Sequence, residues 1–209
     1  MRIEKESIVS FINYNYTPIK KKQVFTRVLL SWGLSVIIYL INQSLIVILF
    51  TGNVLVTGYA TKLISASKIT LKQQNLFVGI QSINLSVILV VASYRFAILN
   101  SKDNMPLLLI LLSLIVVNIG FLLVLVFHLI KKGAYNREVR NNTSITRWSF
   151  IGSFSGFIAA RLFINDTSQD PNAIFLSVML MIIAFLENFE SMFLLKYLLQ
   201  VYLEKQNKL

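Results

Sequence analysis

PLLLILLSLIVVNIGFLLVLVFHLI, residues Pro106 to Ile130, contains no Asp, Glu, Lys or Arg. A helix of about 20 apolar residues crosses the ~30 Å hydrocarbon core of a bilayer. The apolar run is nearly continuous, whereas a strand of a membrane β-barrel would alternate over about 10 residues. The stretch therefore predicts a transmembrane α-helix.

The rest of the chain repeats this pattern. Hydrophobic residues make up 56% of the 209 positions and charged residues 14%, whereas about 25% of a soluble domain is charged. Six stretches are predicted to span a membrane: Phe25–Ile41, Leu45–Ile64, Leu76–Leu99, Pro106–Ile130, Ser149–Ile164 and Ile174–Leu199. We therefore expect an all-α, polytopic membrane helix bundle over residues 25–199, with a cytoplasmic arm at 1–24 and a cytoplasmic tail at 200–209.

The stretch from Val28 to Ile64 allows two interpretations. As one long span it leaves five spans in all, and the basic loop Lys131–Arg147 then lies on the opposite side from the N-terminal arm. As two spans with a turn at Asn42-Gln43-Ser44, it places all the basic segments on one side. Because cation-rich loops stay cytoplasmic, the charge pattern favours six spans, with five as the alternative.

The cations set the orientation. The basic segments hold Arg2, Lys5, Lys20, Lys21, Lys22 and Arg27, then Lys62, Lys68 and Lys72, then Lys131, Lys132, Arg137, Arg140 and Arg147, and finally Lys205 and Lys208. The opposite gaps hold Lys102 beside the acids Asp103, Asp166 and Asp170. This pattern predicts cytoplasmic termini. The abundance of Ile, Leu, Asn and Lys is typical of an AT-rich bacterial genome, so we expect a bacterial plasma membrane. The net charge of +11 then indicates contact with anionic lipid headgroups rather than nucleic acid.

The N-terminal arm mixes apolar and charged residues. Ile3, Ile8, Val9, Phe11 and Ile12 alternate with Glu and Lys. Such a segment lies along the inner headgroup surface when it forms an amphipathic helix. The other interpretation is an unattached cytoplasmic arm.

Five polar residues are expected near the middle of the membrane. Glu187 and Glu190 are three positions apart and so project from one helical face. At matching depth lie Asn118, Asn84 and, one turn nearer the cytoplasm, Gln81. A carboxyl group at that depth faces a partner or a cavity. The five residues predict either a polar pathway, including a proton-titrating site, or hydrogen bonds that hold helices together.

Other polar and small residues carry structural expectations. Arg95 and Arg161, near the outer helix ends, either snorkel to the interface or form a basic lining for an anionic or peptide ligand, and Lys196 is expected to snorkel at the inner end. Gly152, Gly156 and Ala160 recur every four residues in the fifth predicted span, which is typical of close helix packing.

The residues do not predict an enzyme. Cysteine is absent and there is one histidine, so we expect no thiolate chemistry, no H-E-x-x-H metal site and no cofactor. The acids Asp103, Asp166 and Asp170 lie in loops, which excludes an intramembrane aspartyl dyad. Serines within the spans lack a neighbouring base.

Two short segments carry a family resemblance. Thr17-Pro18-Ile19-Lys20-Lys21-Lys22 leads into the first span, and Ile69-Thr70-Leu71-Lys72-Gln73, followed by Gly79, leads into the third. With six spans and cytoplasmic termini, this layout resembles a small ABC-2-type exporter permease. The resemblance implies a separate cytoplasmic ATPase docked on the loop with Lys62, Lys68 and Lys72, a second copy or a second permease, and export of lipids, polymers or peptides.

A non-enzymatic receptor or immunity protein is the alternative. Its layout is similar to the membrane sensor half of peptide-pheromone histidine kinases, in which the last span continues into a cytoplasmic helix. A small immunity protein that binds a peptide or toxin within the bilayer has the same layout. The two classes differ at Glu187 and Glu190, which would line water in a transporter and remain paired in a scaffold.

Overall fold

A computed structural model of the chain describes residues 5–14, 17–41, 46–98, 105–135 and 171–206. Over these ranges the elements are helical, and one 3₁₀ turn, η3, interrupts the last long helix. They are α1 (Lys5–Asn13), α2 (Lys21–Ile41), α3 (Ile46–Ser65), α4 (Leu71–Ala97), α5 (Met105–Lys131), α7 (Pro171–Glu187), η3 (Asn188–Ser191) and α8 (Met192–Gln206).

Within the described ranges, 5 helices are long and apolar enough to cross a membrane. They are α2, α3, α4, α5 and the continuous unit of α7, η3 and α8. The stretch from Val28 to Ile64 forms two helices, α2 and α3, so the two-helix interpretation of that stretch is confirmed. The predicted span Ser149–Ile164, with Gly152, Gly156, Ala160 and Arg161, lies outside the described residues.

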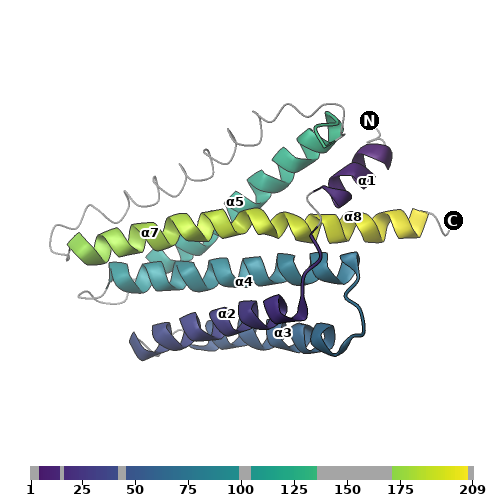
Figure 1. Cartoon of the computed structure of the whole chain (residues 1–209). Helices are drawn as coiled ribbons and strands as arrows, with labels where there is room; N and C mark the ends of the chain where they lie inside the picture. Colours follow the sequence, from purple (N-terminus) through teal and green to yellow (C-terminus); the bar gives the residue numbers. More distant parts are fainter. Residues whose placement is uncertain (1–4, 15–16, 42–45, 99–104, 136–170, 207–209) are drawn as a thin grey trace.

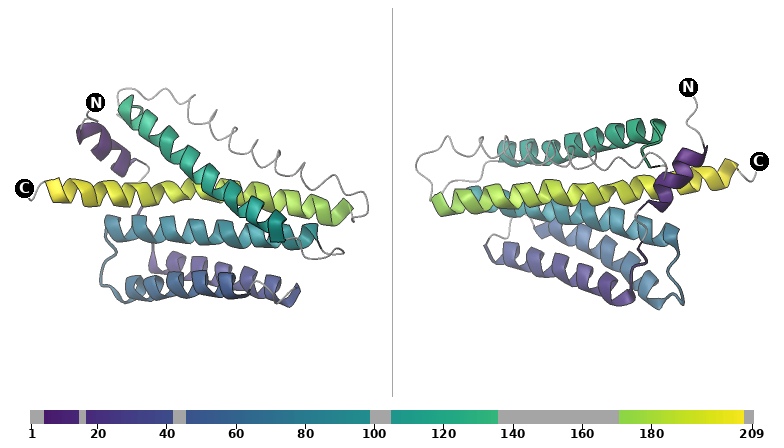
Figure 2. Two further views of the ribbon diagram at one scale, coloured as in Figure 1. Left: turned by 180° about the vertical axis from the view of Figure 1, so that it is seen from behind. Right: turned by 45° about the horizontal axis from the view of Figure 1, so that its top comes forward.

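Helix α4 is the centre of the bundle (Figure 1). In its most apolar stretch of 18 residues, 78% of the residues are buried, against 28% in the corresponding stretch of each other long helix. The reason is that α4 packs on α7 and α8 along one side and on α2 and α3 along another. Helix α5 runs obliquely and packs against α4, η3 and α8 (Figure 2). The outer faces of α2, α3 and α5 expose large aliphatic residues such as Leu40, Val47 and Val116, as expected of surfaces that meet lipid.

A stripe of small residues lets α4 approach the last long helix closely. Ser86 Oγ donates to the Ala184 carbonyl at 3.0 Å, and Ser93 Oγ donates to the Ser177 carbonyl at 2.8 Å. Ser82 Oγ also donates to a carbonyl of α7. Small residues and interhelical hydrogen bonds drive packing where lipid removes the hydrophobic contrast. The stripe predicted from the sequence was Gly152, Gly156 and Ala160 in the fifth span, and the serines of α4 were not predicted to form one.

The N-terminal helix α1 packs on the protein. Its apolar residues Ile8, Phe11 and Ile12 are buried in one cluster with residues of α5 and α8. The Phe11 ring also lies 4.8 Å from that of Tyr135. The described part of the arm therefore follows neither expectation, because its apolar face is covered by α5 and α8 instead of lipid headgroups or water.

Lys196 of α8 binds the C-terminal end of α1. Its side chain is 5% exposed, and its Nζ donates to the Tyr14 carbonyl at 2.6 Å and lies 4.9 Å from the Phe193 ring centroid. The last carbonyls of a helix lack partners within the helix and attract cations. The expectation that Lys196 snorkels to the interface is wrong, because α1 supplies a buried acceptor.

Candidate functional site at the basic end of the bundle

Most of the described cations lie at one end of the bundle, which we term the basic end, whereas Arg95 lies near the other end of α4. The basic end comprises the start of α2, the end of α3, the start of α4 and the ends of α5 and α8, and in Figure 1 it is the side where both chain termini lie. Its lysines are Lys20, Lys21, Lys22, Lys62, Lys68, Lys72, Lys131, Lys132 and Lys205. These lysines therefore lie at one end of the described helices, and the side of the membrane that this end faces stays a prediction.

An ion pair joins the first and last long helices near this end. Arg27 of α2 binds Glu190 of η3 in a two-pronged arrangement, with Nη1 at 2.5 Å from Oε2 and Nη2 at 3.1 Å from Oε1. Planar pairing of a guanidinium with a carboxylate fixes orientation as well as charge. The two side chains are 35% and 37% exposed, so solvent reaches the pair and moderates its strength.

Arg27 is also held through its backbone. Gln81 of α4 donates from Nε2 to the Arg27 carbonyl at 3.0 Å and to Ser31 Oγ at 2.6 Å. Gln81 and Glu190, both predicted members of the polar cluster, thus bind the same residue from two helices. The sequence placed Arg27 among the basic residues of the N-terminal arm but just inside the first predicted span. A cation within an apolar stretch is the signal that could have singled it out as a site residue.

Asn84 belongs to a separate polar layer. Its Nδ2 donates to Asn53 Oδ1 at 2.9 Å, and Asn53 Nδ2 donates to Ser35 Oγ at 2.8 Å. This chain of amides and hydroxyls connects α4, α3 and α2. It is the helix-to-helix hydrogen bonding that was one of the two interpretations of the polar residues.

The remaining predicted residues occupy other positions. Glu187 ends α7, its side chain is half-buried, and its carbonyl accepts the Ser82 hydroxyl. Asn118 is buried on α5, and its Oδ1 has no hydrogen-bond partner. Arg95 is 3% exposed and lies 5.3 Å from the Tyr94 ring. It neither snorkels nor lines an open surface in the described structure, because α4 is enclosed by its neighbours.

Glu190 lies in η3, where the last long helix is interrupted. Residues Asn188 to Ser191 form a 3₁₀ turn between α7 and α8, and mid-helix turns of this kind often mark functional sites. Asn188 is fully buried, and neither polar atom of its side chain has a hydrogen-bond partner among the described residues. An unsatisfied buried amide costs about 1–3 kcal/mol, so the break carries a local cost.

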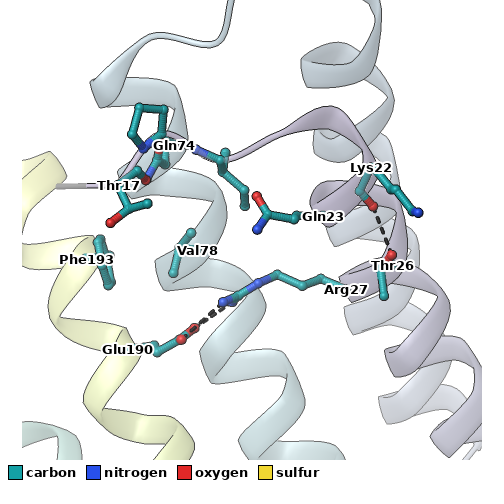
Figure 3. A pocket seen from close by; sticks show the side chains of 11 residues that line it. Thr17, Lys22, Gln23, Thr26, Arg27, Gln74, Val78, Glu190 and Phe193 are labelled. Atoms are coloured by element: carbon teal, nitrogen blue, oxygen red, sulfur yellow. Dashed lines mark hydrogen bonds and ion pairs between the residues drawn. The ribbon is translucent and has the colours of Figure 1, made fainter. Parts of the chain in front are cut away.

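A cavity of about 470 Å³ opens beside the ion pair. Its lining comes from the segment before α2, from α2, α4, η3 and α8, namely Thr17, Pro18, Ile19, Lys22, Gln23, Thr26, Arg27, Gln74, Val78, Glu190 and Phe193. Figure 3 shows Arg27 extending from α2 in front of α4 toward Glu190. The cavity therefore has a basic wall on α2 and an apolar wall that includes Val78 and Phe193.

Gln74 holds the segment that covers the cavity. Its Oε1 accepts the Ile19 N–H at 2.9 Å and its Nε2 donates to the Thr17 carbonyl at 2.7 Å. Gln74 is positioned because α4 begins with a capping box in which Thr70 and Gln73 satisfy each other's backbone N–H groups. One glutamine thus holds together the two segments, 17–22 and 69–73, that carried the family resemblance.

The three lysines of the expected docking loop differ in their surroundings. Lys72 binds Glu204 of α8 at 2.6 Å and lies 5.9 Å from the Tyr197 ring. Lys62 and Lys68 are exposed. The side chains that this loop offers to another protein are therefore those of Lys62 and Lys68.

No protein family, curated protein or solved structure matches this chain.

Proposed function

We propose that this chain is the membrane-spanning subunit of a transporter in a bacterial plasma membrane and that it works with a separate cytoplasmic ATPase. The single observation that carries the proposal is the cavity at the basic end, which borders the Arg27–Glu190 ion pair between the first and last long helices. Ionised residues within predicted transmembrane helices often mark a substrate pathway or its gate. The layout that resembles an ABC-2-type permease supports the same proposal.

Six spans and cytoplasmic termini are part of this proposal. Helix α5 ends at the basic end, whereas α7 begins at the opposite end (Figure 1). In a membrane, an odd number of crossings must connect those two ends, and the apolar stretch Ser149–Ile164 is the candidate. The basic end then faces the cytoplasm, because cation-rich ends are retained there.

The cavity would be the entrance on the cytoplasmic side. Its volume lies within the range of about 300–1,000 Å³ that small-molecule sites occupy. The Arg27–Glu190 pair would act as its inner gate, since the pair is partly solvated and can exchange partners at low cost. The exposed Lys62 and Lys68 would dock the ATPase.

The orientation is tested by cysteine labelling, for which a chain without native cysteine is suited. A Ser44→Cys variant should react with a membrane-impermeant maleimide added to intact cells, and a Ser67→Cys variant should react in inverted vesicles alone. Reversed labelling, or protection of both sites, would rule out the six-span arrangement.

The function is tested by purification of the tagged chain in a gentle detergent. We expect a stoichiometric protein that hydrolyses ATP to co-purify, and Lys62→Glu with Lys68→Glu to remove it. Lys131→Glu with Lys132→Glu, at the same end but on α5, is the matched control and should retain it. If a secreted peptide, a toxin or no protein co-purifies, the transporter proposal fails and the receptor or immunity alternative takes its place.

A further inference from the structure

The cavity at the basic end has an unbalanced charge that points to an anionic ligand. Lys22 and Arg27 of α2 line the cavity together with one acid, Glu190, and the exposed Lys22 side chain points away from the ion pair (Figure 3). Glu187 is the other acid close enough to interact with Arg27. The first turn of α2 contains no acidic residue, although acids are the residues favoured at the positive end of the helix dipole.

The lysines at the start of α2 increase this imbalance. Lys20, Lys21 and Lys22 follow one another at the end of the helix where its N–H groups carry partial positive charge. Cations at that end are unfavourable. Among the described residues, neither ion pair includes one of these three lysines. A bound anion would offset both the helix dipole and the lysines.

The chemistry of the walls narrows the ligand to an amphiphile with a phosphate group. The fork of a guanidinium matches a phosphate as well as it matches a carboxylate. Glu190 is 37% exposed, so a phosphate can share or replace it at Arg27. The opposite wall includes Ile19, Val78 and Phe193, which suit the glycerol and the first methylene groups of a lipid.

The depth of the cavity agrees with a lipid headgroup. Arg27 lies 6 residues after the start of α2, or about 9 Å along the helix axis at about 1.5 Å per residue. Basic pockets between transmembrane helices on the cytoplasmic side are suited to anionic headgroups. We propose that this cavity binds the phosphate group of an anionic glycerophospholipid from the inner leaflet, with Arg27 as one ligand and Lys22, whose exposed side chain can turn inward, as the other.

This inference rests on the proposed function for its orientation and names the ligand class of the same cavity. The test uses the full chain purified in a neutral detergent. Its thermal unfolding midpoint is followed while phosphatidylglycerol, phosphatidylcholine with the same acyl chains, or inorganic phosphate is titrated. We expect saturable stabilisation by phosphatidylglycerol and little by the other two.

Variants locate the effect. Lys22→Gln changes an exposed side chain and should weaken the apparent affinity for phosphatidylglycerol about fivefold, the effect of losing one cation near an anionic headgroup. Lys62→Gln removes an exposed lysine outside the cavity lining and should leave the affinity unchanged. The double variant Arg27→Gln with Glu190→Gln keeps the charge balanced and should weaken binding at least as much as Lys22→Gln.

Two results would overturn the inference. One is an equal response of the wild type, Lys22→Gln and Lys62→Gln, which would mean a diffuse surface effect. The other is an equal stabilisation by inorganic phosphate, which would assign the site to soluble phosphate compounds. Since the binding assay needs no ATPase, its failure leaves the proposed transporter open, and loss of the co-purifying ATPase leaves the lipid site open.

Discussion

Gly79 is the position where the packing of α4 on α8 can be tested most sharply. A Cβ atom added there would lie 2.6 Å from the backbone nitrogen of Leu194 and 2.9 Å from its Cα. Ordinary contact begins at 3.4 Å, so 3.4 minus 2.6 leaves a shift of about 0.8 Å that the two helices must make. Backbone atoms cannot rotate away as a flexible side chain can, and the whole crossing has to open.

Two effects of Gly79→Ala oppose each other. Alanine favours a helix over glycine by about 1 kcal/mol, whereas overpacking a closely packed site costs about 1–3 kcal/mol. The nearest atoms to the added Cβ belong to the backbone of Leu194, so relief requires a movement of the helix itself. We therefore expect the free energy of unfolding to change from no loss to a loss of about 2 kcal/mol, with the larger loss if the backbone of Leu194 does not move.

Matched controls separate the two effects. Gly58 and Gly120 lie in helices, and a Cβ there would meet nothing within 4 Å. Gly58→Ala and Gly120→Ala should therefore gain stability from helix propensity alone. The free energy is measured by unfolding of the purified variants in mixed detergent micelles, with circular dichroism as the signal. If Gly79→Ala is stabilised as much as both controls, the close crossing of α4 and α8 is refuted.

Further predictions concern the ion pair, the helix break and the N-terminal helix. Arg27→Gln or Glu190→Gln alone should lower the free energy of unfolding by about 0.5–1 kcal/mol, because solvent screens a pair that is about one-third exposed. The double variant should lose less than the sum of the two single losses, and a loss equal to that sum would argue against the pair. Asn188→Leu should raise stability by about 1 kcal/mol or more, because it removes two unsatisfied buried atoms; a loss would show that the amide has a partner. Lys196→Met should release α1, so that a Ser7→Cys reporter on its buried face is labelled faster in detergent; unchanged labelling would mean that apolar contacts alone hold α1.

The spans could be predicted because hydropathy is a property of each segment by itself. Pro106–Ile130 has no acid and no Lys or Arg, and no arrangement of neighbours changes the cost of placing it in water. The division of the stretch from Val28 to Ile64 into two helices could also be predicted, since a single span would have put basic residues on both sides of the membrane. Charge and length therefore sufficed to separate α2 from α3.

The partners of the polar residues could not be predicted in the same way. Glu190 and Asn84 were predicted to lie at the same depth from their positions along the two helices. Depth does not determine how each helix is rotated about its own axis, and that rotation decides which residues meet. Because α2, α3 and α5 are apolar nearly all round, their sequences do not determine which side faces the bundle. The structure turns Asn84 toward Asn53 and Glu190 toward Arg27.

The N-terminal helix illustrates a second limit. The pattern of Ile8, Phe11 and Ile12 is equally suited to a lipid surface and to an apolar protein surface. What distinguishes them is a polar contact far along the chain, from Lys196 to the carbonyl of Tyr14. A lipid surface offers no fixed donor to the end of α1, whereas α8 does, so the choice depended on tertiary structure.

The distribution of polar contacts bears on how the cavity could open. Helices α2 and α3 are joined to each other through Ser35 and Asn53, and to α4 through Gln81 and Asn84. Helix α2 is joined to the unit of α7, η3 and α8 by the ion pair between Arg27 and Glu190. Breaking that pair leaves the α2–α3 unit attached to α4 and leaves α4 attached to α7 by its serines. We therefore expect a ligand that competes for Arg27 to widen the space between α2 and α8 while the α2–α3 unit and the contact of α4 with α7 remain intact. The proposed entrance to the cavity requires this movement.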